Sequence, residues 1–250
     1  PSEGPTPDGG ALRIATGSAP VSSGRALTLG AGGGTLELAG ATLDFSGGID
    51  GTGGLVVTGK GGTLNIATSN TYGGGTVLRD GASVLVAGVG TLGTGAVELG
   101  TQDTTLRFGA GASGGSNSYR VGRAGTTDTG NQLVFAQDAT AASSTLNVNG
   151  AGWQASGANT LRFEGTSTAA ASSIVNQGGV VRFEQNATAA GANIANGGAS
   201  LLSFAGASSA GTSSIANQSG GVGRFADTAS ALYAAISNAA GGTLDVWGGA

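Results

Sequence analysis

The chain carries the tetrapeptide Thr42-Leu43-Asp44-Phe45 and repeats its pattern as Thr63-Leu64-Asn65-Ile66. At the same spacing we read further copies at Val84-Leu85-Val86-Ala87 and Thr105-Leu106-Arg107-Phe108. This fixed period of about 21 residues is typical of solenoids and repeat arrays. Because polar and apolar residues alternate in this motif, we expect a strand with leucine and phenylalanine on one face and the middle residue on the other.

After two longer steps, from Phe108 to Phe135 and from Phe135 to Phe163, the motif continues toward the end of the chain. The later copies are Leu133/Phe135, Leu161/Phe163, Val181/Phe183, Leu202/Phe204, Gly223/Phe225 and Leu244/Val246. The longer steps predict one insertion within residues 109–131 and another around residues 149–158. Such insertions leave a solenoid as loops, and loops of this kind carry binding specificity.

A second motif lies between the copies of the first one in the last part of the chain. An isoleucine follows each phenylalanine at one constant distance, as Ile174 follows Phe163, and an asparagine stands two positions further on. Two short strands per repeat, separated by glycine-rich corners, describe one coil of a parallel β-helix. Stacking of equivalent positions then predicts a phenylalanine ladder and an asparagine ladder, although an asparagine at a turn also suits a purely local corner bond. The ladder residues are Phe163, Phe183, Phe204 and Phe225, and Asn176, Asn196, Asn217 and Asn238.

The predicted fold class is therefore all-β, a right-handed single-stranded parallel β-helix (β-solenoid) with about 20–21 residues per coil. With Ala11-Leu12-Arg13-Ile14 as an early copy of the strand motif, the chain makes about eleven coils and a rod of about 50 Å. Residues 1–10 are expected to be a linker-like segment. Residues 11–130 form one stretch of β-helix with an insertion near 109–131, and residues 131–250 continue it with the ladder repeats.

Composition excludes several classes of function. The chain has no cysteine, no histidine, 52 glycines and a net charge of −4. Catalytic triads, Cys-His pairs and ordinary zinc sites need residues that are absent. The one lysine and the scattered arginines form no basic patch, so we expect no nucleic-acid partner. No apolar run is long enough to insert into a membrane, and we predict no catalytic, metal-binding or cofactor-binding residue and no cofactor.

Acidic residues beside the phenylalanine motif are the candidates for catalysis. Glu164 and Glu184 follow the ladder phenylalanines and stand one coil apart, about 5 Å, which would suit a retaining glycosidase. Arg162 and Arg182 flank the same strands, and a solvated row of arginines and glutamates is a poor place to raise the pKa of a carboxylic acid. We therefore expect a surface ladder of ion pairs. Elsewhere, strict spacing stacks Asp44, Asn65, Val86 and Arg107, which makes no acidic column.

One motif stands out between residues 53 and 108: Asn70-Thr71-Tyr72 followed by a Gly-Gly pair, with less specific strands on either side. With this motif, residues 53–108 resemble the autotransporter-associated β-strand repeat. Residues 131–250 are similar to a second repeat type of the same large passenger domains. The resemblance implies a segment of a type V secreted passenger, exposed on the cell surface or released outside a Gram-negative cell. The segments that carry the resemblance are Gly54-Leu55, 61–66, 69–77, 80–86 and 91–99.

We expect this segment to be a structural or adhesive rod that displays loops or neighbouring domains, and not an enzyme. Its partners would be molecules or glycans of a host or neighbouring cell, with self-association through the coil ends also open. Trp153 and Tyr119 are the candidate partner-binding residues, although Trp153 also suits a lid that folds down on the coil. The alternatives are a polysaccharide-cleaving enzyme on the β-helix face and a self-assembling extracellular fibre.

Overall fold

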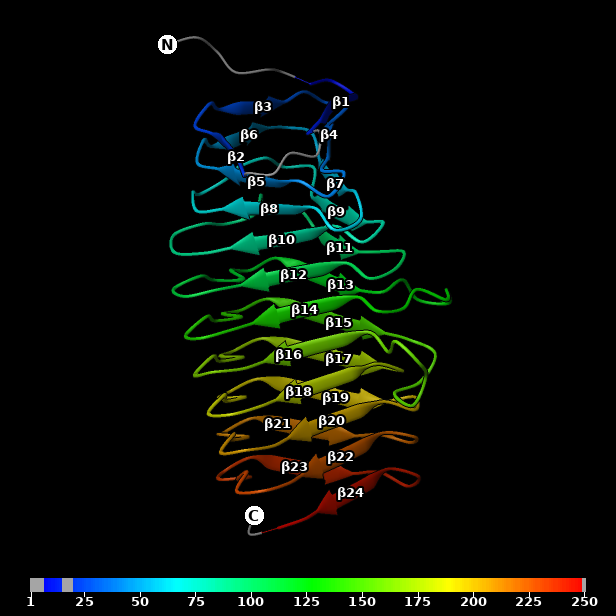
Figure 1. Cartoon of the computed structure of the whole chain (residues 1–250). Coiled ribbons are helices and arrows are strands. Elements are labelled where there is room, and N and C mark those ends of the chain that lie inside the picture. Colours follow the sequence, from blue (N-terminus) through cyan, green and yellow to red (C-terminus); the bar gives the residue numbers. More distant parts are fainter. Residues whose placement is uncertain (1–6, 15–19, 249–250) are drawn as a thin grey trace.

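The computed structural model describes residues 7–14 and 20–248, and these residues form an all-β solenoid of stacked parallel sheets (Figure 1). Each of its two long sheets contains 11 strands, one from every coil. The predicted fold class is confirmed for the β-solenoid and for its repeat of about 21 residues. No part of the chain that the structure describes is a helix that could span a membrane.

The two long sheets, here named sheet A and sheet B, lie on different sides of the rod. Sheet A consists of β1 (Gly10–Arg13), β4 (Gly34–Glu37), β7 (Leu55–Thr58), β9 (Thr76–Arg79), β11 (Val97–Leu99), β13 (Ser118–Val121), β15 (Thr145–Asn149), β17 (Ser173–Gln177), β19 (Asn193–Gly197), β21 (Ser214–Asn217) and β23 (Ala235–Asn238). Sheet B consists of β2 (Val21–Ser23), β5 (Thr42–Phe45), β8 (Thr63–Ile66), β10 (Ser83–Val86), β12 (Thr105–Phe108), β14 (Gln132–Phe135), β16 (Thr160–Phe163), β18 (Val180–Phe183), β20 (Leu201–Phe204), β22 (Val222–Phe225) and β24 (Thr243–Val246). A short third sheet pairs β3 (Leu27–Leu29) with β6 (Ile49–Gly51).

The tetrapeptide motif forms the strands of sheet B, but one copy lies one position earlier than the constant period predicts. Ser83 pairs with Thr63 and Thr105, so that Val84 and Val86 point inward and Leu85 points outward. The coil before Ser83 is therefore shorter by one position than the constant period, and the next coil is longer by one. The predicted motif Val84-Leu85-Val86-Ala87 is wrong in register, because such a shift turns every side chain to the opposite face.

The first coil also differs from the prediction. Residues 10–13 form β1, which pairs with β4 in sheet A rather than with the tetrapeptide strands. The edge of sheet B is formed instead by β2, whose Val21 pairs with Leu43. Short, partly polar strands such as β2 carry little periodicity, so their signal in the sequence is weak. The total of about eleven coils is nevertheless confirmed.

The phenylalanine ladder forms the centre of the core and extends beyond the four predicted members. Rings from six consecutive coils stack with interplanar angles of 2–9° and centroid distances of 4.7–5.0 Å. These distances match the separation of about 4.8 Å between paired strands, so every ring stays in contact with its neighbours. The stacked rings are Phe108, Phe135, Phe163, Phe183, Phe204 and Phe225.

We predict that Phe183→Ala is more destabilising than Arg182→Ala. Phe183 is fully buried between two rings, whereas the Arg182 side chain on the same strand is 47% exposed. Removing the ring should lower the free energy of unfolding by about 3–5 kcal/mol, and removing the arginine by less than about 1 kcal/mol. Denaturant unfolding of the two variants measures the difference, and equal midpoints would contradict the inward placement of Phe183.

The asparagine ladder is confirmed as a chain of side-chain hydrogen bonds. The Nδ2 atoms of Asn176, Asn196 and Asn217 each donate to Oδ1 of the asparagine one coil later, over 2.9, 2.9 and 2.6 Å. Each of these Nδ2 atoms also donates to a backbone carbonyl of sheet B. The first three asparagines are buried, whereas Asn238 at the end of the ladder is exposed. Oδ1 of Asn176 has no partner in the described part of the chain, because Val148 occupies the preceding position of the column.

We predict that Asn196→Ala lowers the free energy of unfolding by about 1–3 kcal/mol, because it leaves buried partners without a hydrogen bond on two neighbouring coils. The matched control is Asn193→Ala on the same strand, where the side chain is exposed and the change should cost less than about 0.5 kcal/mol. Chemical denaturation of both variants provides the test. Equal stabilities of the Asn196→Ala and Asn193→Ala variants would show that Asn196 is only a local corner residue.

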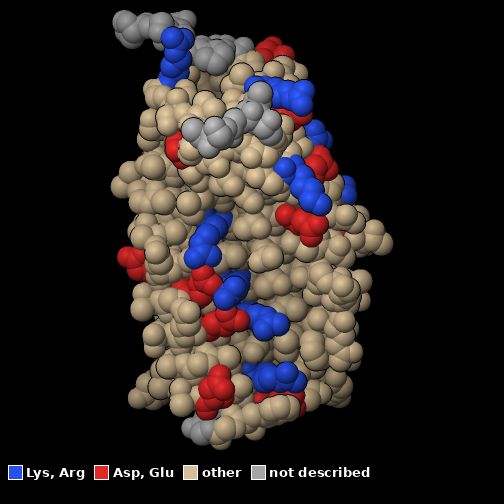
Figure 2. Space-filling model, viewed as in Figure 1, with Lys and Arg blue, Asp and Glu red and all other residues tan. Residues whose placement is uncertain are grey.

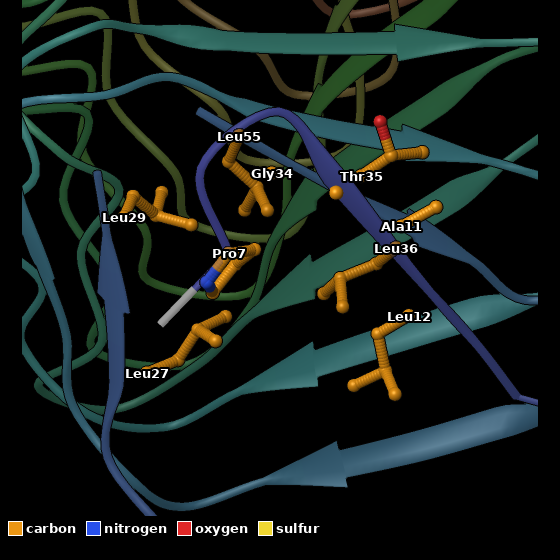
Figure 3. A pocket seen from close by; sticks show the side chains of 10 residues that line it. Pro7, Ala11, Leu12, Leu27, Leu29, Gly34, Thr35, Leu36 and Leu55 are labelled. Atoms are coloured by element: carbon orange, nitrogen blue, oxygen red, sulfur yellow. The ribbon is translucent and has the colours of Figure 1, made fainter. Parts of the chain in front are cut away.

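The two ends of the described rod differ in how the core is covered. At the first coil, Pro7 lies among Leu27, Leu29 and Leu55, over an apolar cavity of ≈ 290 Å³ (Figure 3). The Pro7 carbonyl accepts a hydrogen bond from the Gly30 amide, so this part of the N-terminal segment packs on the coil. The last coil is more open. Its exposed apolar residues are Leu232, Tyr233, Leu244, Val246 and Trp247.

Candidate functional site

Two ten-residue connections on consecutive coils enlarge one corner of the rod. Residues 122–131 join β13 to β14, and residues 150–159 join β15 to β16, whereas only residues 178–179 join β17 to β18. Both lie where the chain returns from sheet A to sheet B, and the loops project at the same side of the rod (Figure 1). The first insertion occupies the last part of its predicted segment, 109–131, and the second overlaps the predicted residues 149–158 but ends one residue later.

The first insertion is held by an ion pair between its own ends. The Arg123 guanidinium donates two hydrogen bonds to the Asp128 carboxylate, over 2.8 and 3.0 Å, and the Arg123 amide donates a third. The Asp128 side chain is nearly buried, at 7% exposed. The hydrogen bonds from Arg123 outweigh the burial and lower the pKa of Asp128 below its ordinary value.

The same insertion forms one wall of a shallow hollow of ≈ 450 Å³ over the corners of the preceding coils. Charged groups of both signs line it, together with threonine hydroxyls. The charged residues are Lys60, Asp80, Asp103, Arg123 and Asp128. Because the acids are interspersed with bases and Asp128 is already held by Arg123, the hollow has neither the donor set of a metal site nor a strong charge of one sign.

We predict that the Arg123–Asp128 pair contributes stability at neutral pH that is lost in acid. A carboxyl group whose pKa is lower in the folded than in the unfolded state stabilises the fold above its unfolded pKa of about 3.9, and this contribution disappears as the pH falls through the folded pKa. Asp128→Asn should therefore be less stable than the unaltered chain at pH 7, with a smaller difference near pH 3. Thermal unfolding across this range measures it, and a pH-independent difference would contradict the assignment.

The second insertion extends along the rod toward the later coils, and we name residues 150–158 the strap. The Gly152 amide donates to the Gly178 carbonyl one coil later, and the Trp153 amide donates to the Ala199 carbonyl two coils later. Val180 and Leu201 occupy outward positions of sheet B next to this region, yet they are only 3% and 4% exposed. These hydrogen bonds hold the strap against the coils that carry Val180 and Leu201, so we infer that the strap covers these residues and that Trp153 folds down on the coils as a lid.

Trp153 takes part in a cation–π arrangement on the outer face of sheet B. The guanidinium carbon of Arg224 lies 6.0 Å from the centre of the Trp153 ring and 4.9 Å from the centre of the Trp247 ring. Trp153 is partly buried, whereas Trp247 is 59% exposed. Arg224 also pairs with Asp245 at 3.2 Å. No sequence pattern indicates this cluster, because residues 153 and 224 are brought together only by the path of the strap.

The prediction that Tyr119 lies on an exposed loop is wrong. Tyr119 belongs to β13, is 1% exposed, packs edge-on against Phe108 and donates a hydrogen bond to the Gly114 carbonyl. It shares an inward column with Val97 and Leu146, and burial raises the pKa of its hydroxyl. The longer step that suggested a loop around Tyr119 arises after the strand, in the first insertion. Tyr119 is therefore a core residue with no surface to offer a partner.

The Asn-Thr-Tyr motif also has a structural role. Asn70 Oδ1 accepts a hydrogen bond from the Ile49 amide over 2.7 Å, and its Nδ2 donates to the Thr91 carbonyl over 2.6 Å. One asparagine therefore joins the coil before it to the coil after it. Tyr72 is fully buried, and its hydroxyl bonds Thr76 Oγ1 over 2.6 Å.

Glu164 and Glu184 form the predicted ladder of ion pairs. Glu164 contacts Arg107 at 2.6 Å and Arg162 at 3.0 Å, and Glu184 contacts Arg162 at 2.7 Å and Arg182 at 3.9 Å. Basic and acidic side chains alternate along the rod axis on this face (Figure 2). Each carboxylate has two arginine neighbours, so both glutamates are held in ion pairs on the surface of the rod.

Across residues 7–14 and 20–248, no three acidic side chains come close enough together to hold a metal ion. Comparison with known proteins gives no match to a family model, to a curated protein or to a solved structure. The features of the described rod that bear on function are the corner loops and the outer face of sheet B.

Proposed function

We propose that this chain is a rod-like scaffold segment that holds neighbouring domains apart and presents a partner-binding surface beside its two insertions. The observation that carries this proposal is the contrast between a regular interior and a locally elaborated corner. The aromatic and amide ladders pass through consecutive coils without interruption, whereas two consecutive coils carry ten-residue loops at the same place. Loops that escape the register constraint are free to specify a partner.

The mechanical part of the proposal follows from the core. In a solenoid each coil contacts only its neighbours, so stiffness requires contacts that continue from coil to coil. Stacked rings at 4.7–5.0 Å and hydrogen-bonded asparagines supply such contacts along the rod. The repeated glycine corners and the Asn-Thr-Tyr motif further support the proposal that the rod belongs to an autotransporter passenger at the cell surface.

The binding part is tested by replacing strap residues 151–157 with two glycines. We expect the rod to remain folded, because no ring of the phenylalanine ladder lies in the strap, with a loss of stability of about 1–3 kcal/mol from exposure of the apolar residues beneath it. Circular dichroism and denaturant unfolding measure the fold. Binding of labelled chain to panels of epithelial and bacterial cells, which we expect to be lost, measures the function.

A companion variant shortens the first insertion by replacing residues 124–127 with two glycines. This variant retains Arg123, Asp128 and the strap, so it separates the contribution of the strap to binding from that of the first insertion. Unchanged cell binding by the strap variant would move the binding surface away from this corner. Failure of the unaltered chain to bind any cell would contradict the adhesive part and leave a scaffold alone.

A further inference from the structure

Four arginines follow the outer face of sheet B in one line along the rod, and we name them the arginine stripe. They lie on strands β12, β16, β18 and β22, at positions that share one outward column. Five coil steps separate the first from the last, a distance of about 24 Å. The stripe consists of Arg107, Arg162, Arg182 and Arg224.

Three of the four arginine side chains are more exposed than the acidic side chains that pair with them, whereas Arg224 and Asp245 are similarly exposed, at 28% and 26%. Arg107 and Arg162 are 42% and 39% exposed, whereas Glu164, which pairs with both, is 14% exposed. Arg182 is 47% exposed and its partner Glu184 is 26% exposed. The acids of the three more exposed arginines therefore lie lower and fix these arginines in place. The three acids that pair with the four arginines, together with Asp44 in the same outward column, give this face charges of both signs.

The C-terminal end of the stripe adds aromatic surface. Trp153 and Trp247 both lie near the Arg224 guanidinium, and Trp247 is 59% exposed. Indole rings stack on the apolar faces of sugar rings, and arginine binds carboxylates through two parallel hydrogen bonds. Basic and aromatic groups in one line thus suit an extended ligand that is both anionic and built of rings.

We propose that the arginine stripe and the tryptophans at its end bind a linear carboxylated polysaccharide, a polyuronate chain, that lies along the rod. The carboxylates of the sugar chain accept hydrogen bonds from the outward N–H groups, and a sugar ring stacks on the exposed side of Trp247. This proposal rests on the proposed function, since it names the ligand class for the surface that the strap completes. It also places the ligand on the face of sheet B, with Trp153 as the contribution of the insertion.

The test uses the whole chain with hexagalacturonate as the probe and cellohexaose as the neutral comparison, both measured by calorimetry. We expect hexagalacturonate to bind and cellohexaose to bind at least roughly tenfold more weakly, and we expect the affinity for hexagalacturonate to fall as the salt concentration rises. Arg182→Ala and Trp247→Ala should each weaken hexagalacturonate binding by roughly fivefold or more. Arg182 is the appropriate arginine because Glu184 keeps its shorter contact with Arg162.

Arg79→Ala is the matched control, because Arg79 is an exposed arginine on sheet A and its removal lowers the net charge equally. It should leave the affinity unchanged. Equal weakening by Arg79→Ala and Arg182→Ala would show that net charge alone attracts the sugar, and it would overturn the proposal. So would absence of hexagalacturonate binding, binding that Trp247→Ala does not change, or tighter binding of oligothymidylate than of hexagalacturonate.

These outcomes are distinct from failure of the proposed function. If hexagalacturonate does not bind but the chain still adheres to cells through the strap, the proposed ligand class is wrong and the proposed scaffold with its partner-binding surface is retained. In the opposite case, hexagalacturonate binds, Trp153→Ala weakens its binding, and cell binding does not depend on the strap. The proposed ligand class is then correct, and the proposal that the strap mediates adhesion is wrong. Circular dichroism of every variant confirms that the coils remain formed.

Discussion

The structure depends on one constraint: inward side chains on successive coils must stack at the spacing of paired strands. Ring centroids along the ladder stand 4.7–5.0 Å apart, close to the distance of about 4.8 Å that the backbone hydrogen bonds impose. Planar rings and amides satisfy this spacing well, because each contacts an identical group above and below. No disulfide contributes, since the chain has no cysteine. Stability therefore comes from many equivalent contacts between neighbouring coils.

This constraint explains why the sequence predicts the coil and its ladders. Phe163, Phe183, Phe204 and Phe225 recur in phase with Ile and Asn, and the structure places them in the predicted columns. The same constraint explains the error at residues 83–86. Corners change slightly in length from coil to coil, whereas the inward column cannot shift, so the apolar pair Val84 and Val86 defines the register rather than a constant period.

The candidate site was less predictable, because its parts are joined by the path of a loop. The longer steps between motifs located both insertions. They did not indicate that the strap extends over the next two coils, where Val180 and Leu201 are buried. Nor did they separate Trp153, which reaches the outer face of sheet B, from Tyr119, which lies in the core. Spacing reports where the repeat is interrupted, and tertiary contacts decide where the extra residues go. The strap thus connects the irregular corner to the regular face that carries the arginine stripe.

The most direct test of the register of the coils uses pairs of cysteines introduced into this cysteine-free chain. Asn65 and Leu85 are paired outward positions on neighbouring coils, at a separation that a disulfide can bridge. Under mild oxidation, the variant with Asn65→Cys and Leu85→Cys should form an intramolecular disulfide. The variant with Asn65→Cys and Val86→Cys, which a constant period would pair, should not, because residue 86 faces the core. Efficient crosslinking of the second pair and none of the first would contradict the account.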